Sequence, residues 1–257
     1  MPPDGVPELE GRVALITGAA GSIGTAIAQA LTARGARTVL ADRDRAHLEG
    51  LARDLGTGRS TWIAGDAGDS SHVQDAVRLA TERFGGLDIA VANAGMFGAH
   101  APIAEYPEET FTEVMRVNVV GPFLLCKHAL PAIREGGSVI ITSSVVGLTS
   151  DPGICAYATS KHALVGLMRT AMKEAAPRSI RINTIHPGPT DNAFQHAIET
   201  TVTGLDPAAA SAVFERMIPL GRHATPEEVA ATVAFLVGPG GAFITGATIP
   251  IDGGMSV

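Results

Sequence analysis

The sequence contains few cysteines, few aromatic residues and no excess of positive charge. Two of its 257 residues are cysteines, Cys126 and Cys155, and they lack the spacing of a metal site. We therefore expect free thiols in a reducing, cytoplasmic compartment and no bound metal. The net charge of −7 argues against nucleic acid or an acidic membrane as a partner. No apolar run reaches the ~18 residues that a membrane-spanning helix requires.

The N-terminus lacks the basic and apolar segments of a secretion signal. Residues 1–10 are predicted to form a short mobile tail. The chain is 46% hydrophobic and 18% charged, which is typical of a globular protein with a large core. Because no linker, repeat or low-complexity block divides residues 11–257, we expect a single domain there.

Short runs of apolar and β-branched residues alternate with longer helical stretches. The first run, residues 13–16, is apolar throughout, as a strand buried on both faces should be. Further strands are expected at residues 38–41, 60–64, 88–91, 138–142, 180–185 and 247–250. Helices are expected from Gly24 to about Arg34, at residues 45–55, 71–84, 107–133 and 154–175, and from Thr225 onward. This alternation predicts an α/β Rossmann fold, a doubly wound parallel sheet of about seven strands flanked by helices.

A glycine-rich segment, residues 17–24 (TGAAGSIG), lies between the first strand and the first helix. Glycines at such a turn let backbone N–H groups approach a pyrophosphate, and the helix N-terminus favours the negative charge. Tight turns also require glycine, which is the competing structural explanation. The residues predicted to bind the phosphates here are Gly18, Gly21, Ser22, Ile23 and Gly24.

Polar side chains follow the next three predicted strands, at the carboxyl ends where such sheets bind ligands. Asp42 ends the second strand, and its carboxylate can accept hydrogen bonds from an adenosine ribose and repel a 2′-phosphate. This favours NAD as the cofactor. Arg43 can instead hold that phosphate, so NADP is the alternative. The cofactor residues expected after the third and fourth strands are Asp66, Ala67, Asn93, Ala94 and Gly95.

Tyr157 and Lys161 lie four positions apart in a predicted helix, so their side chains share one face. A tyrosine titrates near a pKa of about 10 and is no useful acid or base at neutral pH. A close ammonium, helped by the positive ring of a bound cofactor, would favour the phenolate and lower that pKa. By itself, the pair is more typical of an ordinary helix surface.

The glycine turn, the polar residues after the strands and the Tyr157–Lys161 pair follow one another along the chain. In that order they resemble the motifs of the classical short-chain dehydrogenase/reductase family. Ser144 precedes Tyr157 by 13 residues, the spacing of that family. The departures are Ser22, which replaces a glycine of the first turn and can cap the helix, and Ala92, which replaces an asparagine. The resemblance runs from Gly11 to Gly254 and rests on the glycine turn, Asp66, Asn93, Ala94, Gly95, Asn118, Ser144, Tyr157, Lys161, Pro187, Gly188, Asp252, Gly253 and Gly254.

The resemblance implies a role for each catalytic residue. Tyr157 would be the general acid/base, Lys161 would lower its pKa and hold the nicotinamide ribose, and Ser144 would hydrogen-bond the substrate oxygen. Asn118 would hold a water that links Lys161 to solvent. The resemblance further implies that a segment after the sixth strand covers the nicotinamide. Its expected cofactor residues are Pro187, Gly188 and Thr190, with Asn192 as the alternative to Thr190.

Pro122, four residues after Asn118, gives a second reason to expect a special role for Asn118. Proline lacks the N–H that would bond the carbonyl at i−4, and here that carbonyl belongs to Asn118. We therefore expect a free carbonyl and a kink at this position. The hypothesis is that Pro122 exposes the acceptor of a proton relay. The alternative is an ordinary kink without bearing on catalysis.

Residues 189–217 are expected to form a substrate lid, with a fixed subunit contact as the alternative. Met96, Val145, Ile154 and Phe194 would line a mostly apolar substrate pocket. The sequence thus predicts an NAD-dependent enzyme that interconverts a secondary alcohol and a ketone. Alternatives are an NADP-dependent carbonyl reductase and a non-catalytic dinucleotide-binding regulatory protein. The resemblance also implies a homotetramer.

Overall fold

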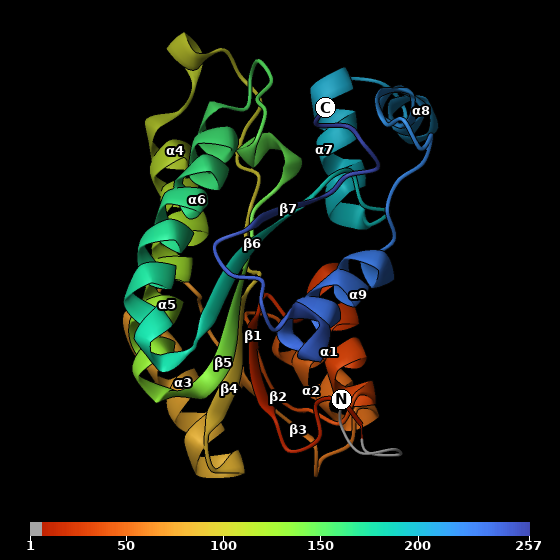
Figure 1. Ribbon diagram of the computed structural model, residues 1–257. Coiled ribbons are helices and arrows are strands. Elements are labelled where there is room, and N and C mark those ends of the chain that lie inside the picture. Colours follow the sequence, from red (N-terminus) through yellow and green to blue (C-terminus); the bar gives the residue numbers. More distant parts are fainter. Residues whose placement is uncertain (1–6) are drawn as a thin grey trace.

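A computed structural model describes residues 7–257 as a parallel sheet covered by helices on both faces (Figure 1). Within these residues the sheet has seven strands in the order β3-β2-β1-β4-β5-β6-β7, which confirms the predicted doubly wound sheet. The strands are β1 Val13–Thr17, β2 Arg37–Asp42, β3 Ser60–Ala64, β4 Leu87–Ala92, β5 Ile133–Thr142, β6 Arg181–Pro187 and β7 Thr248–Ile251. The order reverses between β1 and β4, where sheets of this kind bind ligands at the carboxyl ends.

The helices form two layers and an outlying pair. In Figure 1, α1, α2 and α9 lie on one face of the sheet, and α3, α5 and α6 lie on the other, with α4 leading into α5. Helices α7 and α8 lie beyond the carboxyl ends of the strands. The bounds are α1 Ser22–Ala33, α2 Arg45–Asp54, α3 Ser70–Phe84, α4 Glu108–Met115, α5 Gly121–Ala132, α6 Cys155–Ala175, α7 Ala193–Thr203, α8 Pro207–Met217 and α9 Pro226–Val237.

The first strand shows why a doubly covered sheet forms from this sequence. All five residues of β1 are buried. Val13 and Leu15 join the core beneath α3, α5 and α6, whereas Ala14 and Ile16 join the core beneath α1, α2 and α9. Because successive side chains point to opposite faces, an apolar run without alternation is stable only between two layers of helices.

Helix α9 begins where the sequence predicts. The hydroxyl of Thr225 accepts a hydrogen bond from the N–H of Glu228 at 3.3 Å, and Oε2 of Glu228 accepts one from the N–H of Thr225 at 2.8 Å. This capping box satisfies two N–H groups that the start of a helix leaves without partners.

Two segments differ from the sequence prediction. A π-helical turn at Arg116–Val120 interrupts the helix expected over residues 107–133. Strand β5 begins at Ile133, before the expected residue 138, because Ile133 pairs with Leu87 and the ladder resumes only at Ser138 opposite Ile89. The intervening glycines resemble a turn in sequence. The segment after β6, which is expected to form a substrate lid, contains two helices, α7 and α8.

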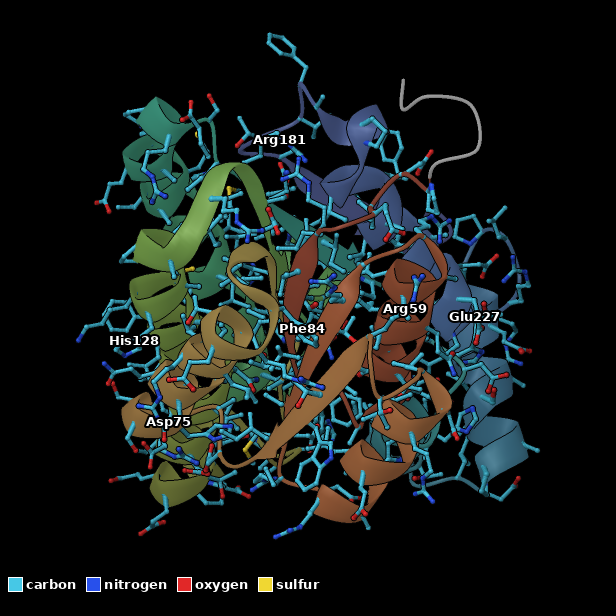
Figure 2. The ribbon with its side chains drawn as sticks, turned by 90° about the horizontal axis from the view of Figure 1, so that it is seen from below. Arg59, Asp75, Phe84, His128, Arg181 and Glu227 are labelled. Carbon is cyan, nitrogen blue, oxygen red and sulfur yellow. The ribbon has the colours of Figure 1, made fainter. Side chains whose placement is uncertain are left out.

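The prediction of a mobile tail over residues 1–10 is wrong for Leu9. Leu9 is buried, and its N–H donates to the carbonyl of Arg34 at 2.9 Å. Residues 7–10 are thus part of the folded domain, and residues 1–6 lie outside the described residues. Charged side chains such as Arg59, Asp75 and Glu227 project at the surface (Figure 2). Over residues 7–257, no helix is both long and apolar enough to cross a membrane.

Candidate active site

One cavity of about 530 Å³ lies at the carboxyl ends of the strands. Its wall is built from the segments that follow β1 to β6 and from α7 and α8. It brings together all the predicted site residues except Gly24 and Asn118, which are buried behind the wall. The predicted residues that line it are Gly18, Gly21, Ser22, Ile23, Asp42, Arg43, Asp66, Ala67, Asn93, Ala94, Gly95, Met96, Ser144, Val145, Ile154, Tyr157, Lys161, Pro187, Gly188, Thr190 and Phe194.

The glycine turn leaves the start of α1 open to the cavity. Gly18 has a φ of +67°, and a Cβ there would lie 2.7 Å from the backbone N of Ala94. Gly24 has no room for a Cβ either, because the carbonyl oxygen of Gly18 occupies that position. The N-cap of α1 is Gly21, so Ser22 does not cap the helix as expected, and no acidic side chain lies in its first turn. Such an uncapped helix N-terminus favours an anion.

Two carboxylates, those of Asp42 and Asp66, line the part of the cavity where the sequence predicts an adenosine. Asp42 accepts hydrogen bonds from the N–H groups of Ala20 at 3.1 Å and Arg43 at 2.6 Å, which places the carboxylate beside the glycine turn. Asp66 pairs with the guanidinium of Arg116 at 2.7 Å. The hydrogen bond from Arg116 holds the pKa of Asp66 below its usual value, against the effect of burial.

Two asparagines fix the loop that follows β4. Nδ2 of Asn93 donates to the carbonyl of Gly18 at 3.1 Å and ties this loop to the glycine turn. Asn118 is fully buried, and its amide both accepts from the N–H of Met96 at 2.8 Å and donates to the Met96 carbonyl at 2.9 Å. The side chain of Asn118 therefore positions the loop that carries Met96.

Asn118 also lies within the π-helical turn, two residues before its end at Val120. This break in α-helical geometry lies where Pro122 leads us to expect a kink. In this turn the N–H of Gly121 bonds the carbonyl of Arg116, five residues earlier. A free Asn118 carbonyl that serves a proton relay stays a prediction.

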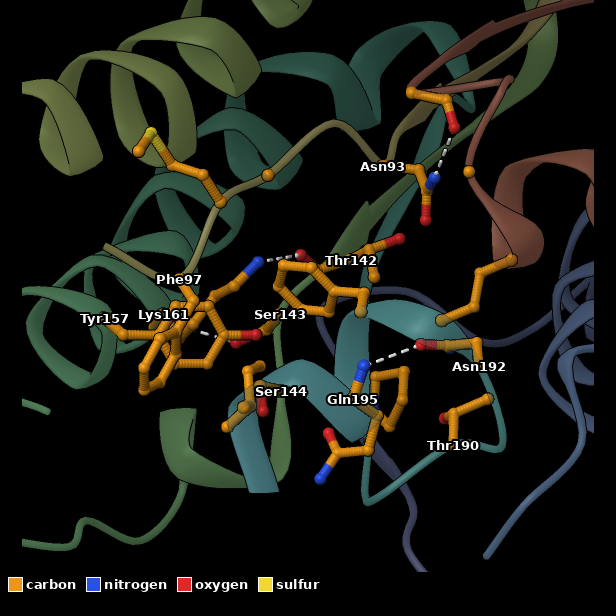
Figure 3. Close-up of a pocket in the computed structure, with 18 of the residues that line it drawn as sticks. Asn93, Phe97, Thr142, Ser143, Ser144, Tyr157, Lys161, Thr190, Asn192 and Gln195 are labelled. Carbon is orange, nitrogen blue, oxygen red and sulfur yellow. Dashed lines mark hydrogen bonds between the residues drawn. The ribbon is translucent and has the colours of Figure 1, made fainter. Parts of the chain in front are cut away.

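Tyr157, Lys161 and Ser144 meet on one side of the cavity (Figure 3). Nζ of Lys161 lies 5.5 Å from the centroid of the Tyr157 ring, as the spacing in α6 requires. The same ammonium donates to the carbonyl of Thr142 at 3.0 Å. The ring of Phe97 packs against that of Tyr157 with 5.4 Å between centroids. A phenol, a hydroxyl and an ammonium thus converge at one wall.

Burial dominates the ionisation of this group. Desolvation raises the pKa of Tyr157 to about 12, although a hydrogen bond with Ser144 opposes the shift. Desolvation also lowers the pKa of Lys161 to about 8. Among the protein's own groups, burial sets the direction of this shift, and a lowering of the Tyr157 pKa by Lys161 together with a bound cofactor's positive ring stays a prediction.

His186 contacts the site in a way that the sequence does not reveal. It is fully buried, with Nδ1 2.8 Å from the carbonyl oxygen of Ser144 and Nε2 2.9 Å from Oγ1 of Thr184. A carbonyl only accepts, so Nδ1 donates and Nε2 accepts from the threonine hydroxyl. Burial lowers the pKa of His186, which agrees with a neutral ring. His186 therefore positions the backbone of Ser144.

The segment after β6 is anchored on both sides. The N–H of Gly188 donates to the carbonyl of Ile251, and a Cβ on Gly188 would lie 2.9 Å from Cα of Asp252. Thr190 is buried, and its hydroxyl donates to the carbonyl of Gly188 at 3.1 Å. Asn192, the alternative to Thr190, caps α7 by accepting from the N–H of Gln195 at 2.8 Å.

The chain is similar to known oxidoreductases over almost its whole length. A family model described as enoyl-(acyl carrier protein) reductase matches residues 18–256. A 3-oxoacyl-[acyl-carrier-protein] reductase from Thermotoga maritima is 34% identical over 253 residues, which are 97% of this chain and 99% of that protein.

Two solved structures with a bound nicotinamide cofactor share the fold. One is a 3-ketoacyl-(acyl-carrier-protein) reductase from Brucella melitensis complexed with NADH, with a TM-score of 0.88 and 30% identity over 97% of this chain and 100% of that chain. The other, a blue fluorescent protein from a metagenomic library in complex with NADPH, has the same TM-score of 0.88, 30% identity and coverage of 97% and 100%. The chain therefore belongs to the short-chain dehydrogenase/reductase family of NAD(P)-dependent oxidoreductases.

Proposed function

We propose that the protein is an NAD-dependent enzyme that interconverts a secondary alcohol and a ketone. The observation that carries this proposal is the convergence of Tyr157, Ser144 and Lys161 at one wall of the cavity. Hydride transfer adds or removes negative charge on a single oxygen, so two donors must meet at that oxygen. The phenol of Tyr157 and the hydroxyl of Ser144 provide such a pair.

In the oxidative direction, Oη of Tyr157 accepts the proton of the substrate hydroxyl while the carbinol carbon loses a hydride. In the reductive direction, the phenol returns the proton to the ketone oxygen. Ser144 donates a hydrogen bond to that oxygen in both directions. A nicotinamide, when bound, supplies the acceptor or the donor of the hydride. Lys161 keeps a positive charge beside the phenol.

The residues present fit a dinucleotide. The open N-terminus of α1 and the backbone of Gly21 suit a pyrophosphate, because the cavity wall there consists of main chain without a capping side chain. The carboxylate of Asp42 would accept from the adenosine ribose. Lys161, a buried ammonium whose hydrogen-bond partner in the protein is Thr142, would donate to the nicotinamide ribose.

The test is the reduction of NAD by the purified protein with a broad panel of secondary alcohols, and the reverse reaction with the ketones. We expect turnover with at least one alcohol–ketone pair. Cofactor binding without turnover of any member would contradict an enzyme and favour the regulatory alternative. Enoyl reduction is not proposed, because the family resemblance implies a longer gap between tyrosine and lysine in its enoyl-reductase branch than the three residues between Tyr157 and Lys161.

The choice of cofactor provides a prediction. Asp42→Asn removes the charge that repels a 2′-phosphate while Arg43 stays at the cavity, so we expect the preference for NAD over NADP to fall by about tenfold or more. Dissociation constants for both cofactors measure the change. Asp54→Asn, an exposed position on α2, is the matched control. If wild-type protein binds NADP more tightly than NAD, the NADP-dependent alternative replaces this part of the proposal.

The pH dependence of alcohol oxidation and of ketone reduction provides a second prediction. Because the pKa of Tyr157 is raised to about 12 in the protein, its phenolate is scarce at neutral pH. Oxidation needs this base, so kcat/KM for the alcohol should rise up to about tenfold per pH unit, while reduction should not rise. The range from about pH 6 to about pH 8 is suitable, because Lys161, with a pKa of about 8, stays protonated over most of it. Parallel profiles in both directions would contradict the assignment.

We also propose a homotetramer and a cytoplasmic location, as the family resemblance and the cysteine content suggest. Large apolar side chains that lie on α5 and α9 support the former, since Phe123 is 47% and Phe235 is 52% exposed. Sedimentation equilibrium measures the oligomeric state. A monomer at the concentration used in activity assays would contradict the proposed homotetramer.

A further inference from the structure

The part of the cavity beyond Tyr157 and Ser144 is formed largely by apolar side chains. They come from the loop after β4, the segment before α6, and both helices of the insert. Representative members of this wall are Phe97, Ile154, Phe194, Ile198, Val213 and Phe214. A surface of this kind favours carbon skeletons over heavily hydrated groups, because burying apolar area releases water without breaking hydrogen bonds.

Charged side chains are scarce in this part of the wall. Within residues 7–257, the lysine and arginine side chains that line the cavity are Lys161, which belongs to the catalytic group, and Arg43, which follows β2 at the adenosine side. A charged side chain that lines the cavity near Ile154 is Asp151, which is exposed. A substrate carboxylate or phosphate would thus enter without a cation to pair with, and such burial is unfavourable.

One polar side chain of the wall is held in a defined orientation. Nε2 of Gln195 donates to Oε1 of Glu199 at 3.0 Å, and the same oxygen lies 2.6 Å from Nε2 of His223. Glu199 and His223 are both buried, so this contact joins α7 to the segment before α9. Because a carboxylate oxygen accepts, it fixes the nitrogen of the Gln195 amide toward Glu199.

The other end of this amide faces the cavity. Gln195 lines the cavity, and in Figure 3 its amide oxygen lies on the side of Ser144 while its nitrogen points away. Oε1 is therefore presented as an acceptor in a wall that is largely apolar. An acceptor held in this way selects a ligand that carries a hydroxyl or another donor.

We propose that the substrate is a neutral, largely apolar secondary alcohol or ketone that carries a second hydroxyl away from the reacting carbon, received by Oε1 of Gln195. The inference rests on the proposed alcohol–ketone activity and narrows its substrate class. Acids and phosphorylated compounds are excluded by the missing cation, and unsubstituted hydrocarbon alcohols leave the glutamine acceptor unpaired.

A substituent series tests the substrate class. The compounds are secondary alcohols built on two skeletons, cyclohexane and decalin. Each compound carries one of four groups far from the reacting carbon: a methyl, a hydroxyl, an aminomethyl (an ammonium at neutral pH) or a carboxylate. We expect the hydroxyl compound to have the highest kcat/KM on at least one ring, and the carboxylate the lowest by about 100-fold. Preference for the carboxylate or the ammonium compound overturns the inference and leaves the alcohol–ketone activity intact. Failure of all compounds, with NAD bound, contradicts the proposed function instead.

A variant at Gln195 tests the assigned acceptor. In Gln195→Leu, kcat/KM for the hydroxyl compound should fall about tenfold more than kcat/KM for the methyl compound, since one hydrogen bond is lost for the first alone. Gln74→Leu, an exposed glutamine on α3, is the matched control. Equal loss for both compounds would show that Gln195 acts only on the packing of α7, and would overturn its role as acceptor.

Discussion

A Tyr157→Phe variant is expected to lose at least about 1,000-fold in kcat in both directions, because it removes the only proton donor and acceptor proposed for the reacting oxygen. The ring itself should stay in place, since its packing against Phe97 does not require the hydroxyl. Affinity for NAD should change by no more than about threefold. Stopped-flow traces of cofactor reduction, together with titration of NAD, measure both quantities.

The second tyrosine provides the control. Tyr106 is buried, and its hydroxyl accepts from the N–H of Ala99 at 3.0 Å, outside the residues that line the cavity. Tyr106→Phe should cost about 1 kcal/mol of folding stability while hydride transfer continues. A Tyr157→Phe enzyme with more than a tenth of wild-type kcat would refute the role assigned to Tyr157.

Replacing Lys161 is expected to destroy activity and to stabilise the fold. The pKa of Lys161 is lowered from 10.5 to about 8 by burial, and that shift corresponds to about 3 kcal/mol of unfavourable desolvation at neutral pH. Lys161→Met removes this cost but loses the hydrogen bond to Thr142, so a net gain of about 2 kcal/mol is expected at pH 7. Turnover should become undetectable, and affinity for NAD should fall about tenfold or more. Denaturant unfolding and cofactor titration measure these effects.

The stability gain should depend on pH in a defined direction. Between about pH 8 and pH 10.5, Lys161 has largely lost its proton in the folded state but keeps it in the unfolded chain. The unfolded state then binds more protons, so wild-type stability rises with pH and the advantage of Lys161→Met shrinks. Lys173→Met, an exposed position on the same helix, should show no such trend. A Lys161→Met protein that is less stable than wild type at pH 7, or that binds NAD unchanged, would contradict the account.

Local patterns in the sequence predict much of the site. Tyr157 and Lys161 share a helix face because of their spacing, and Ser144 and Asp42 reach the same edge because parallel strands end there. Pro122 indicates the irregular turn around Asn118 through a missing N–H that is visible in sequence. Each of these inferences uses the sequence of a single helix or strand, together with the rule that parallel strands end at the same edge of a sheet.

Other features depend on contacts between distant segments and could not be predicted in this way. The pKa of Tyr157 is raised because the folded wall excludes water from it, which spacing alone does not encode. Gln195 is oriented through Glu199 and His223, which lie in different segments that pack together only in the fold. His186 supports Ser144 across 42 residues of sequence. In each case tertiary packing, rather than local pattern, decides the chemistry.

Hydride transfer between a secondary alcohol and NAD, supported by Tyr157, is the reaction proposed for this protein. Its most direct test uses an alcohol of the hydroxyl-bearing series with deuterium on the carbinol carbon, and mass spectrometry of the reduced cofactor. Wild-type enzyme is expected to move the deuterium to the nicotinamide, and Tyr157→Phe, saturated with NAD, is expected to yield almost no labelled cofactor. Reduced cofactor without deuterium, or equal labelling by the two proteins, would contradict it.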